Sequence, residues 1–156
     1  MAASGLSEWD WEIRLHIYRQ FVAHERPPTY DETARAFAMP ASDVRAAYHR
    51  LDAAHALFLE PGGDTIRMAH PLSAIATPYR VHIDGHWLYA NCAWDALGIP
   101  AMLHTDARIE ATLAHAAEPA RYAVVGGQLM AGPELAGAVV HFALPFRRWY
   151  DDLIHT

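Results

Sequence analysis

Two prolines, Pro71 and Pro78, separate two kinds of hydrophobic pattern in this chain of 156 residues. Before them, apolar residues recur at steps of three and four, which is the period of a helix that packs one face on a core. After them, apolar and polar residues alternate in short runs, the period of a half-buried strand. Two prolines within eight residues interrupt regular structure. The sequence therefore predicts an α+β protein with a boundary near Ala69, which divides it into domains at residues 1–69 and 70–156.

Three helices are predicted before the boundary, over residues 9–24, from Thr29 to about Phe37, and over residues 42–54. Thr29 and Glu32 have the spacing of a capping box, which marks where the second helix begins. The expected apolar face of the first helix is Trp11, Leu15, Tyr18 and Val22, widened by Ile13, Ile17 and Phe21. The expected buried residues of the third helix are Val44, Ala47, Tyr48 and Leu51.

A β-hairpin is predicted after the third helix, because residues 56–59 and 65–68 flank a run of turn-forming residues at 60–64. Three helices and such a wing form a winged-helix pattern, in which the third helix reads DNA. That helix offers Arg45, His49 and Arg50. Asp43 and Asp52 offset these cations, so we expect a structural domain and not a nucleic-acid partner.

Beyond the boundary, Asp84-Gly85 is a strong signal for a two-residue hairpin between strands at residues 79–83 and 86–89. The expected register places His82 and His86 on opposite sides of the sheet, where they are a poor metal pair. Further strands are predicted at residues 107–113, 122–125 and 137–144, with turns at Gly126-Gly127 and Gly132-Pro133. A final helix is predicted to begin over residues 147–153 and to continue to the end of the sequence at Thr156, so that, if the natural chain continues, a second thiol is expected to be possible further along it.

The single cysteine, Cys92, lies beside the acid Asp95 in a short predicted helix. Asn91 is the expected N-cap and Gly98 with Pro100 the expected stop, so Cys92 falls in the first turn. The helix dipole there favours a thiolate, and a spacing of three residues places the Asp95 carboxyl on the same face. A lone cysteine among apolar neighbours is also a common small core residue, and an acid in a first turn needs no further role. Spacing alone does not decide between these interpretations.

Residues 71–100 resemble the alkylmercury (organomercurial) lyase family, above all in Ala76-Thr77-Pro78-Tyr79-Arg80-Val81 and in Ala90-Asn91-Cys92-Ala93-Trp94-Asp95-Ala96-Leu97-Gly98-Ile99-Pro100-Ala101. The resemblance implies that Cys92 binds the mercury of R–Hg⁺. It also implies that Asp95 carries the proton that replaces mercury on carbon. The family's second cysteine has no counterpart near the predicted strand at residues 137–144.

Mercury is a soft ion that prefers thiolate, so Cys92 is the expected ligand for mercury as substrate and product. With one thiol, the second sulfur has to come from an external small thiol or a partner chain, and no cofactor is expected. Burial beside Trp94 and the helix start act on the proton affinity of Asp95 in opposite directions, and the sequence leaves the sign open. A binding protein that captures an organometal without turnover, and a winged-helix regulator, are the alternative functions.

The charge and composition of the chain limit the kinds of partner that it is expected to bind. The net charge of −6 and the absence of lysine disfavour a strong grip on phosphate backbones. A single cysteine excludes an internal disulfide and suits a reducing cytoplasm, and no apolar run reaches the length of a membrane span. We therefore expect a cytoplasmic protein with a small-molecule organometal substrate and no membrane partner. The oligomeric state cannot be predicted.

Overall fold

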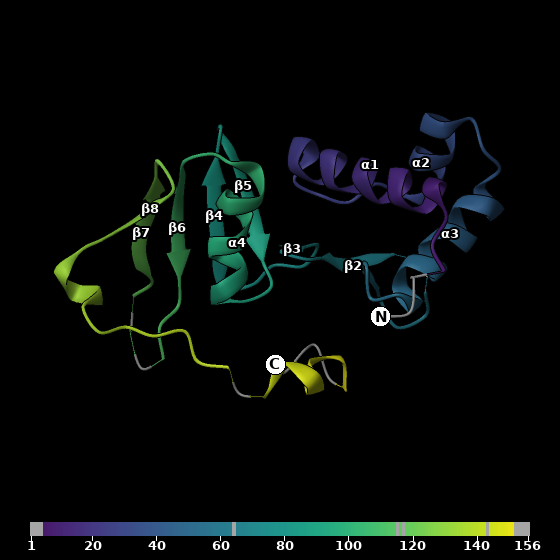
Figure 1. The fold of residues 1–156 in the computed structure, drawn as a ribbon. Coiled ribbons are helices and arrows are strands. Elements are labelled where there is room, and N and C mark those ends of the chain that lie inside the picture. The colour runs from purple at the N-terminus through teal and green to yellow at the C-terminus, as the bar shows by residue number, and fades with distance from the viewer. Residues whose placement is uncertain (1–4, 64, 115, 117, 143, 152–156) are drawn as a thin grey trace.

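The computed structural model describes residues 5–63, 65–114, 116, 118–142 and 144–151. Over these residues the chain has the predicted α+β fold, with four α-helices and one eight-stranded antiparallel sheet (Figure 1). The elements follow in the order α1 (Glu8–His24), α2 (Tyr30–Phe37), α3 (Ala41–Ala53), β1 (Phe58–Leu59), β2 (Ile66–Ala69), β3 (Leu72–Ser73), β4 (Tyr79–Ile83), β5 (His86–Ala90), α4 (Ala93–Leu103), β6 (Ala107–Ala111), β7 (Ala120–Val125) and β8 (Gln128–Ala131). Short 3₁₀ helices follow at Pro133–Leu135 and Phe146–Asp151.

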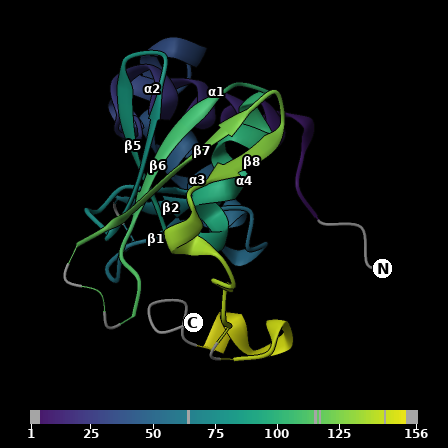
Figure 2. The same ribbon diagram turned by 90° about the vertical axis from the view of Figure 1, so that its left-hand side faces the viewer.

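The sheet has the strand order β1-β2-β3-β5-β4-β6-β7-β8. Its short strand β3 pairs with β2 on one side and with β5 on the other. The sheet therefore continues across the predicted boundary at Ala69. Figure 2, which looks from the β8 end, shows α4 lying along one face of this sheet. The division at residue 69 stays a prediction.

Helix α1 is where the sequence predicts it, but the expected apolar face is only partly right. Ile13, Ile17 and Phe21 are fully buried, because α1 packs on α3 along this stripe. Trp11 and Leu15 are 46% and 49% exposed. Both residue sets have helical spacing, and only the packing against α3 decides which one enters the core.

The predicted cap of α2, the buried residues of α3 and the hairpin after α3 are confirmed. Thr29 caps α2, since its hydroxyl accepts from the backbone N–H of Glu32 at 3.2 Å and its own N–H donates to the Glu32 carboxylate at 2.8 Å. In α3 the buried residues are the expected Val44, Ala47, Tyr48 and Leu51. The predicted hairpin is present as β1 and β2, although Asp64 lies outside the described residues.

The β4–β5 hairpin has the predicted turn and register. Asp84 and Gly85 have φ values of 48° and 87°, the left-handed pair that a tight hairpin turn requires. Ile83 lies opposite His86, and His82 lies opposite Trp87, so the two histidines are on opposite sides of the sheet. Among the described residues, no group of three histidine, cysteine or acidic side chains could hold a metal ion.

Three predictions beyond this hairpin are wrong. Helix α4 does not end at Gly98 and Pro100 but continues to Leu103, because Ala96, Ile99 and Pro100 are buried and the helix packs on β4, β5 and β6. Tertiary packing here outweighs the low helix propensity of both residues. The apolar run at residues 137–144 is not a strand in its described part, where Val139 is exposed and pairs with no neighbour in the sheet. The predicted final helix is a 3₁₀ helix at Phe146–Asp151, and Leu153 lies outside the described residues.

Strand β8 was not predicted. All four of its residues are exposed, so its sequence carries no core-facing alternation. The turn that introduces it, Gly126-Gly127, was predicted, and both glycines have positive φ. None of the helices in the described part of the chain combines the length and the apolarity that a membrane crossing requires.

Candidate functional site: a cysteine and carboxylate pair at the start of α4

Cys92 connects the end of β5 to the first turn of α4. It is the N-cap of the helix, with an extended backbone at φ −149° and ψ 179°, and its side chain makes no cap hydrogen bond. The predicted cap, Asn91, lies one residue before the observed cap, so Cys92 is not within the first turn as predicted. The side-chain amide of Asn91 instead donates to the carbonyl of Pro71 at 3.2 Å. The sheet register explains this contact, because Leu72 pairs with Ala90 and the chain before β3 therefore runs beside the chain after β5.

The predicted pair is brought together. The Cys92 thiol donates to Oδ2 of Asp95 with a sulfur–oxygen distance of 3.4 Å, within the limit for a hydrogen bond that involves sulfur. The sulfur belongs to a half-buried residue, and the Asp95 side chain is 16% exposed. Cys92 and Asp95 therefore share one face, as their spacing predicts. Trp94, the expected cover of Asp95, is itself 55% exposed.

The expected thiolate is not what this environment favours. Burial raises the pKa of the Cys92 thiol above its ordinary value, and the charge of Asp95 raises it further. Backbone N–H groups of Asp95 and Trp94 lower the pKa, but they do not compensate. The helix start supplies only these N–H groups, and burial outweighs them. The pair is thus a thiol hydrogen-bonded to a carboxylate.

A third group, His70, faces the same carboxylate oxygen and was missed by the sequence interpretation. Its Nδ1 lies 3.8 Å from Oδ2 of Asp95 and 3.3 Å from the side-chain nitrogen of Asn91. No local motif indicates this contact, since His70 is far from Cys92 in sequence and is brought to it by the pairing of β3 with β5.

Aromatic side chains contact two neighbours of the pair, Trp94 and His70. The ring of Trp94 meets the edge of Phe142 at a centroid distance of 6.0 Å, and Phe142 packs in turn on Trp149 at 5.1 Å. On the other side, Phe58 of β1 meets His70 edge-on at 5.2 Å. The 3₁₀ segment, yellow in Figure 1, therefore lies close to the start of α4 and to the β1–β2 hairpin.

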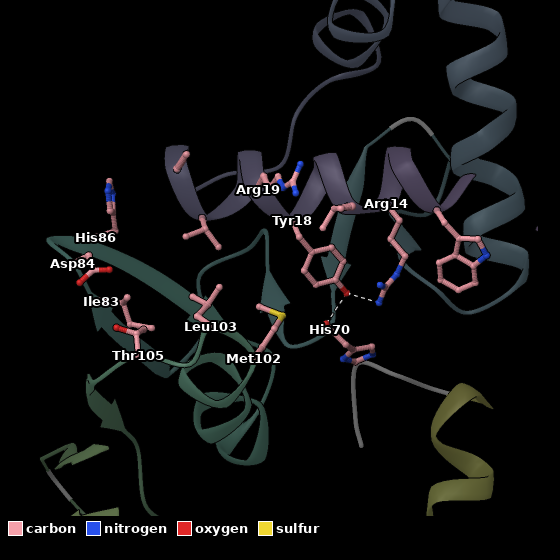
Figure 3. A pocket seen from close by; sticks show the side chains of 14 residues that line it. Arg14, Tyr18, Arg19, His70, Ile83, Asp84, His86, Met102, Leu103 and Thr105 are labelled. Carbon is pink, nitrogen blue, oxygen red and sulfur yellow. Dashed lines mark hydrogen bonds between the residues drawn. The ribbon is translucent and has the colours of Figure 1, made fainter. Parts of the chain in front are cut away.

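A cavity of about 840 Å³ lies between α1, α4 and the β4–β5 hairpin (Figure 3). The exposed stripe of α1 forms one wall, with Leu103 and Ile83 on the opposite wall. Cys92 and Asp95 do not line it, whereas His70 does. Beside His70, Tyr18 donates to the His70 carbonyl at 2.6 Å. Burial raises the pKa of Tyr18, Asp95 raises it further, and Arg14 acts in the opposite direction.

Fold and site together define an α+β protein with a half-buried thiol and carboxylate pair where a strand passes into a helix. The sequence profile of the MerB alkylmercury lyases matches residues 72–154, slightly more than half of the chain. The chain belongs to the alkylmercury lyase family.

Structural comparison shows the same fold in a solved protein, the mercury-bound form of MerB2, with a TM-score of 0.65 and 22% sequence identity. The match covers 81% of this chain and 60% of that one, so the chain spans about three fifths of the MerB2 structure. A search of curated proteins finds no match.

Proposed function

We propose that this protein cleaves the carbon–mercury bond of organomercurials by protonolysis, with Cys92 as the mercury ligand and Asp95 as the proton carrier. The observation that carries the proposal is the direct hydrogen bond from the Cys92 thiol to Oδ2 of Asp95. The family membership supplies the reaction class. The pair supplies the two chemical groups that this reaction needs, a soft ligand and an acid, on one face of a helix start.

The raised pKa of Cys92 fits this chemistry. When R–Hg⁺ binds the sulfur, the thiol proton passes along the existing hydrogen bond to the Asp95 carboxylate, which leaves R–Hg–S and a protonated carboxyl. Asp95 then gives this proton to the carbon. The electron pair of the C–Hg bond forms the new C–H bond, the hydrocarbon leaves, and Hg(II) remains on the sulfur beside a carboxylate. The proton that neutralises carbon thus comes from the cysteine that captures mercury.

Release of mercury from Cys92 requires a second sulfur. Cys92 is the one cysteine of the sequence, so this sulfur has to come from another molecule. External small thiols, acting as co-substrates, are proposed to take Hg(II) from Cys92 and to leave its sulfur free for the next cycle. Mercury binds thiolate more strongly than any nitrogen or oxygen ligand, so no side chain of this chain replaces that sulfur.

The test is incubation of the purified protein with a phenylmercury compound and excess small thiol, with benzene release followed by gas chromatography. We expect catalytic release by the wild type, background release by Cys92→Ala, and strongly reduced release by Asp95→Asn, which retains the sulfur but carries no transferable proton. Benzene release by the wild type that is no greater than release by Cys92→Ala would contradict the catalytic proposal.

Capture of an organometal without turnover is the second candidate, and the presence of a single thiol favours it. It predicts a one-to-one adduct in native mass spectrometry that is lost in Cys92→Ser, with no benzene above background. Benzene release in several-fold excess over protein would eliminate this candidate.

For the N-terminal region we propose a winged-helix-like unit, residues 1–69, that supports the site at residues 70–156 and does not read DNA. Two of the three candidate reading residues have internal partners. Arg50 forms an ion pair with the buried Asp10 at 2.7 Å, and the His49 ring lies against Gly63 so closely that a β-carbon there would be 2.8 Å away. A mobility shift with duplex DNA at low salt is expected to stay flat, and salt-sensitive binding would contradict this assignment.

A further inference from the structure

His70 precedes the region matched by the family profile, which begins at residue 72, and yet its ring reaches the proposed proton carrier. Its Nδ1 is 3.8 Å from Oδ2 of Asp95, the oxygen that also accepts from the Cys92 thiol. The distance is longer than that of a hydrogen bond. A thiol and an imidazole thus approach one carboxylate oxygen from different parts of the chain.

His70 is held in this place from several directions. The Tyr18 hydroxyl of α1 donates to its carbonyl at 2.6 Å, and Arg14 donates to the same hydroxyl at 2.8 Å, as the dashed lines in Figure 3 show. The Phe58 ring meets its imidazole edge-on, and the Asn91 amide lies 3.3 Å from Nδ1. A surface histidine without a role needs no such support. The contacts fix the imidazole relative to Asp95 while leaving its side chain 38% exposed.

We infer that His70 is a positioning residue of the site, which holds Oδ2 of Asp95 beside the Cys92 sulfur. The inference rests on the proposed lyase function for its kinetic consequence. During the cycle the carboxyl gives its proton to carbon and becomes an anion. His70 and the Cys92 thiol face that anion, and the charge of Asp95 also acts on Tyr18, which Arg14 contacts. Through Tyr18 and Phe58, the N-terminal region takes part in the geometry of the site.

The kinetic test compares His70→Ala with His86→Ala. His86 is a matched control, because it lines the same cavity and faces one carboxylate, Glu25, at 3.3 Å. His70→Ala is expected to lower kcat by about 10- to 100-fold with a nearly unchanged KM, the usual effect of removing a group that orients a reactive residue. Added imidazole should restore part of this loss, and His86→Ala should behave as the wild type. A changed KM with an unchanged kcat would overturn the inference.

A second test does not need turnover. The rate at which Cys92 reacts with an uncharged aromatic disulfide is measured at one fixed pH for the wild type, His70→Ala, Asp95→Asn and the double variant. If His70 acts through Asp95, its removal changes the rate by about threefold or more when Asp95 is present and has no effect in the D95N background. Equal effects in both backgrounds would overturn the inference.

Tyr18→Phe guards against an uninformative loss of folding, because it removes only the hydroxyl that holds the His70 backbone. It should change the Cys92 rate in the same direction as His70→Ala, by a smaller factor, and an unchanged rate would count against the inference. Absence of benzene release by the wild type would end the lyase proposal, while the thiol rates would still decide whether His70 positions Asp95.

Discussion

At the scale of single residues, the Oδ2 atom of Asp95 has two polar neighbours. The Cys92 thiol gives it a proton-bearing donor at 3.4 Å, and His70 presents a ring nitrogen at 3.8 Å. The carboxylate raises the pKa of the thiol after burial has already done so, and it therefore keeps the sulfur protonated until a metal displaces the proton.

The first prediction concerns this effect on the sulfur. Asp95→Asn removes a negative charge beside Cys92 but retains the backbone N–H groups that favour a thiolate, so the pKa of Cys92 falls. We expect the thiol of this variant to react about 3- to 10-fold faster at neutral pH, since one pKa unit changes the thiolate fraction tenfold. Stopped-flow measurement with an aromatic disulfide checks it. A slower reaction than that of the wild type would contradict the assigned role of the carboxylate.

The second prediction concerns Tyr48, whose hydroxyl lies 2.9 Å from the Thr33 hydroxyl inside the helical region. Burial raises the pKa of Tyr48 to about 12. The folded protein therefore holds the neutral phenol, while the unfolded chain ionises near pH 10, so stability is lost as the pH rises from about 10 to 12. The loss attributable to Tyr48 is about 3 kcal/mol. Urea unfolding at several pH values should show it in the wild type and not in Tyr48→Phe.

At the scale of elements, helix boundaries show where sequence reasoning succeeds and where it fails. The capping box at Thr29 and the Asp84-Gly85 turn are local, so the sequence predicts them correctly. The continuation of α4 through Gly98 and Pro100 depends on packing against three strands, which no local signal contains. The same reason hides His70, whose approach to Asp95 is made by strand pairing. Cys92 and Asp95 were predicted because the family resemblance covers both residues and a spacing of three places them on one helical face.

The third prediction compares two residues of α1. Ile17 is fully buried and Leu15 is 49% exposed in the cavity wall. Ile17→Ala leaves a hole in the core and should cost about 2–5 kcal/mol of unfolding free energy. Leu15→Ala should cost less than about 1 kcal/mol. Denaturant midpoints of the two variants, measured side by side, check the difference, and equal losses would show that the exposed stripe also belongs to the core.

The fourth prediction concerns Gly98 in the interior of α4. A β-carbon at this position would lie 3.4 Å from the nearest atom of Pro71, an ordinary contact. Alanine loses less backbone entropy than glycine in a helix, so Gly98→Ala should stabilise the protein by about 0.5–1 kcal/mol. Thermal unfolding measures the shift. A destabilised variant would mean that Pro71 cannot tolerate the added methyl group.

At the scale of the whole molecule, β3 joins strands from both sides of the predicted domain boundary into one hydrogen-bonded sheet. Buried residues of α1 and α3 also join the same hydrophobic core as those of β4, β6 and α4. The two regions that the sequence distinguishes are thus continuous in both hydrogen bonding and packing.

The fifth prediction follows from this continuity. Unfolding should be a single cooperative transition, because neither region can lose its structure without exposing the core of the other. Hydrogen exchange is the measurement: the slowest amides of α1 and α3 and those of β4 and β6 should exchange with the same opening free energy. Two separate values would instead support independent domains.

The two stripes of α1 have different consequences for change in this protein. Ile13, Ile17 and Phe21 are buried in the core, so substitutions at these positions change the stability of the protein. Trp11 and Leu15 line the cavity and are about half exposed, so new side chains at these two positions alter the size and polarity of the cavity while the buried face keeps the helix in place. Substitutions on this side of α1 can therefore change the cavity beside His70 without destabilising the fold.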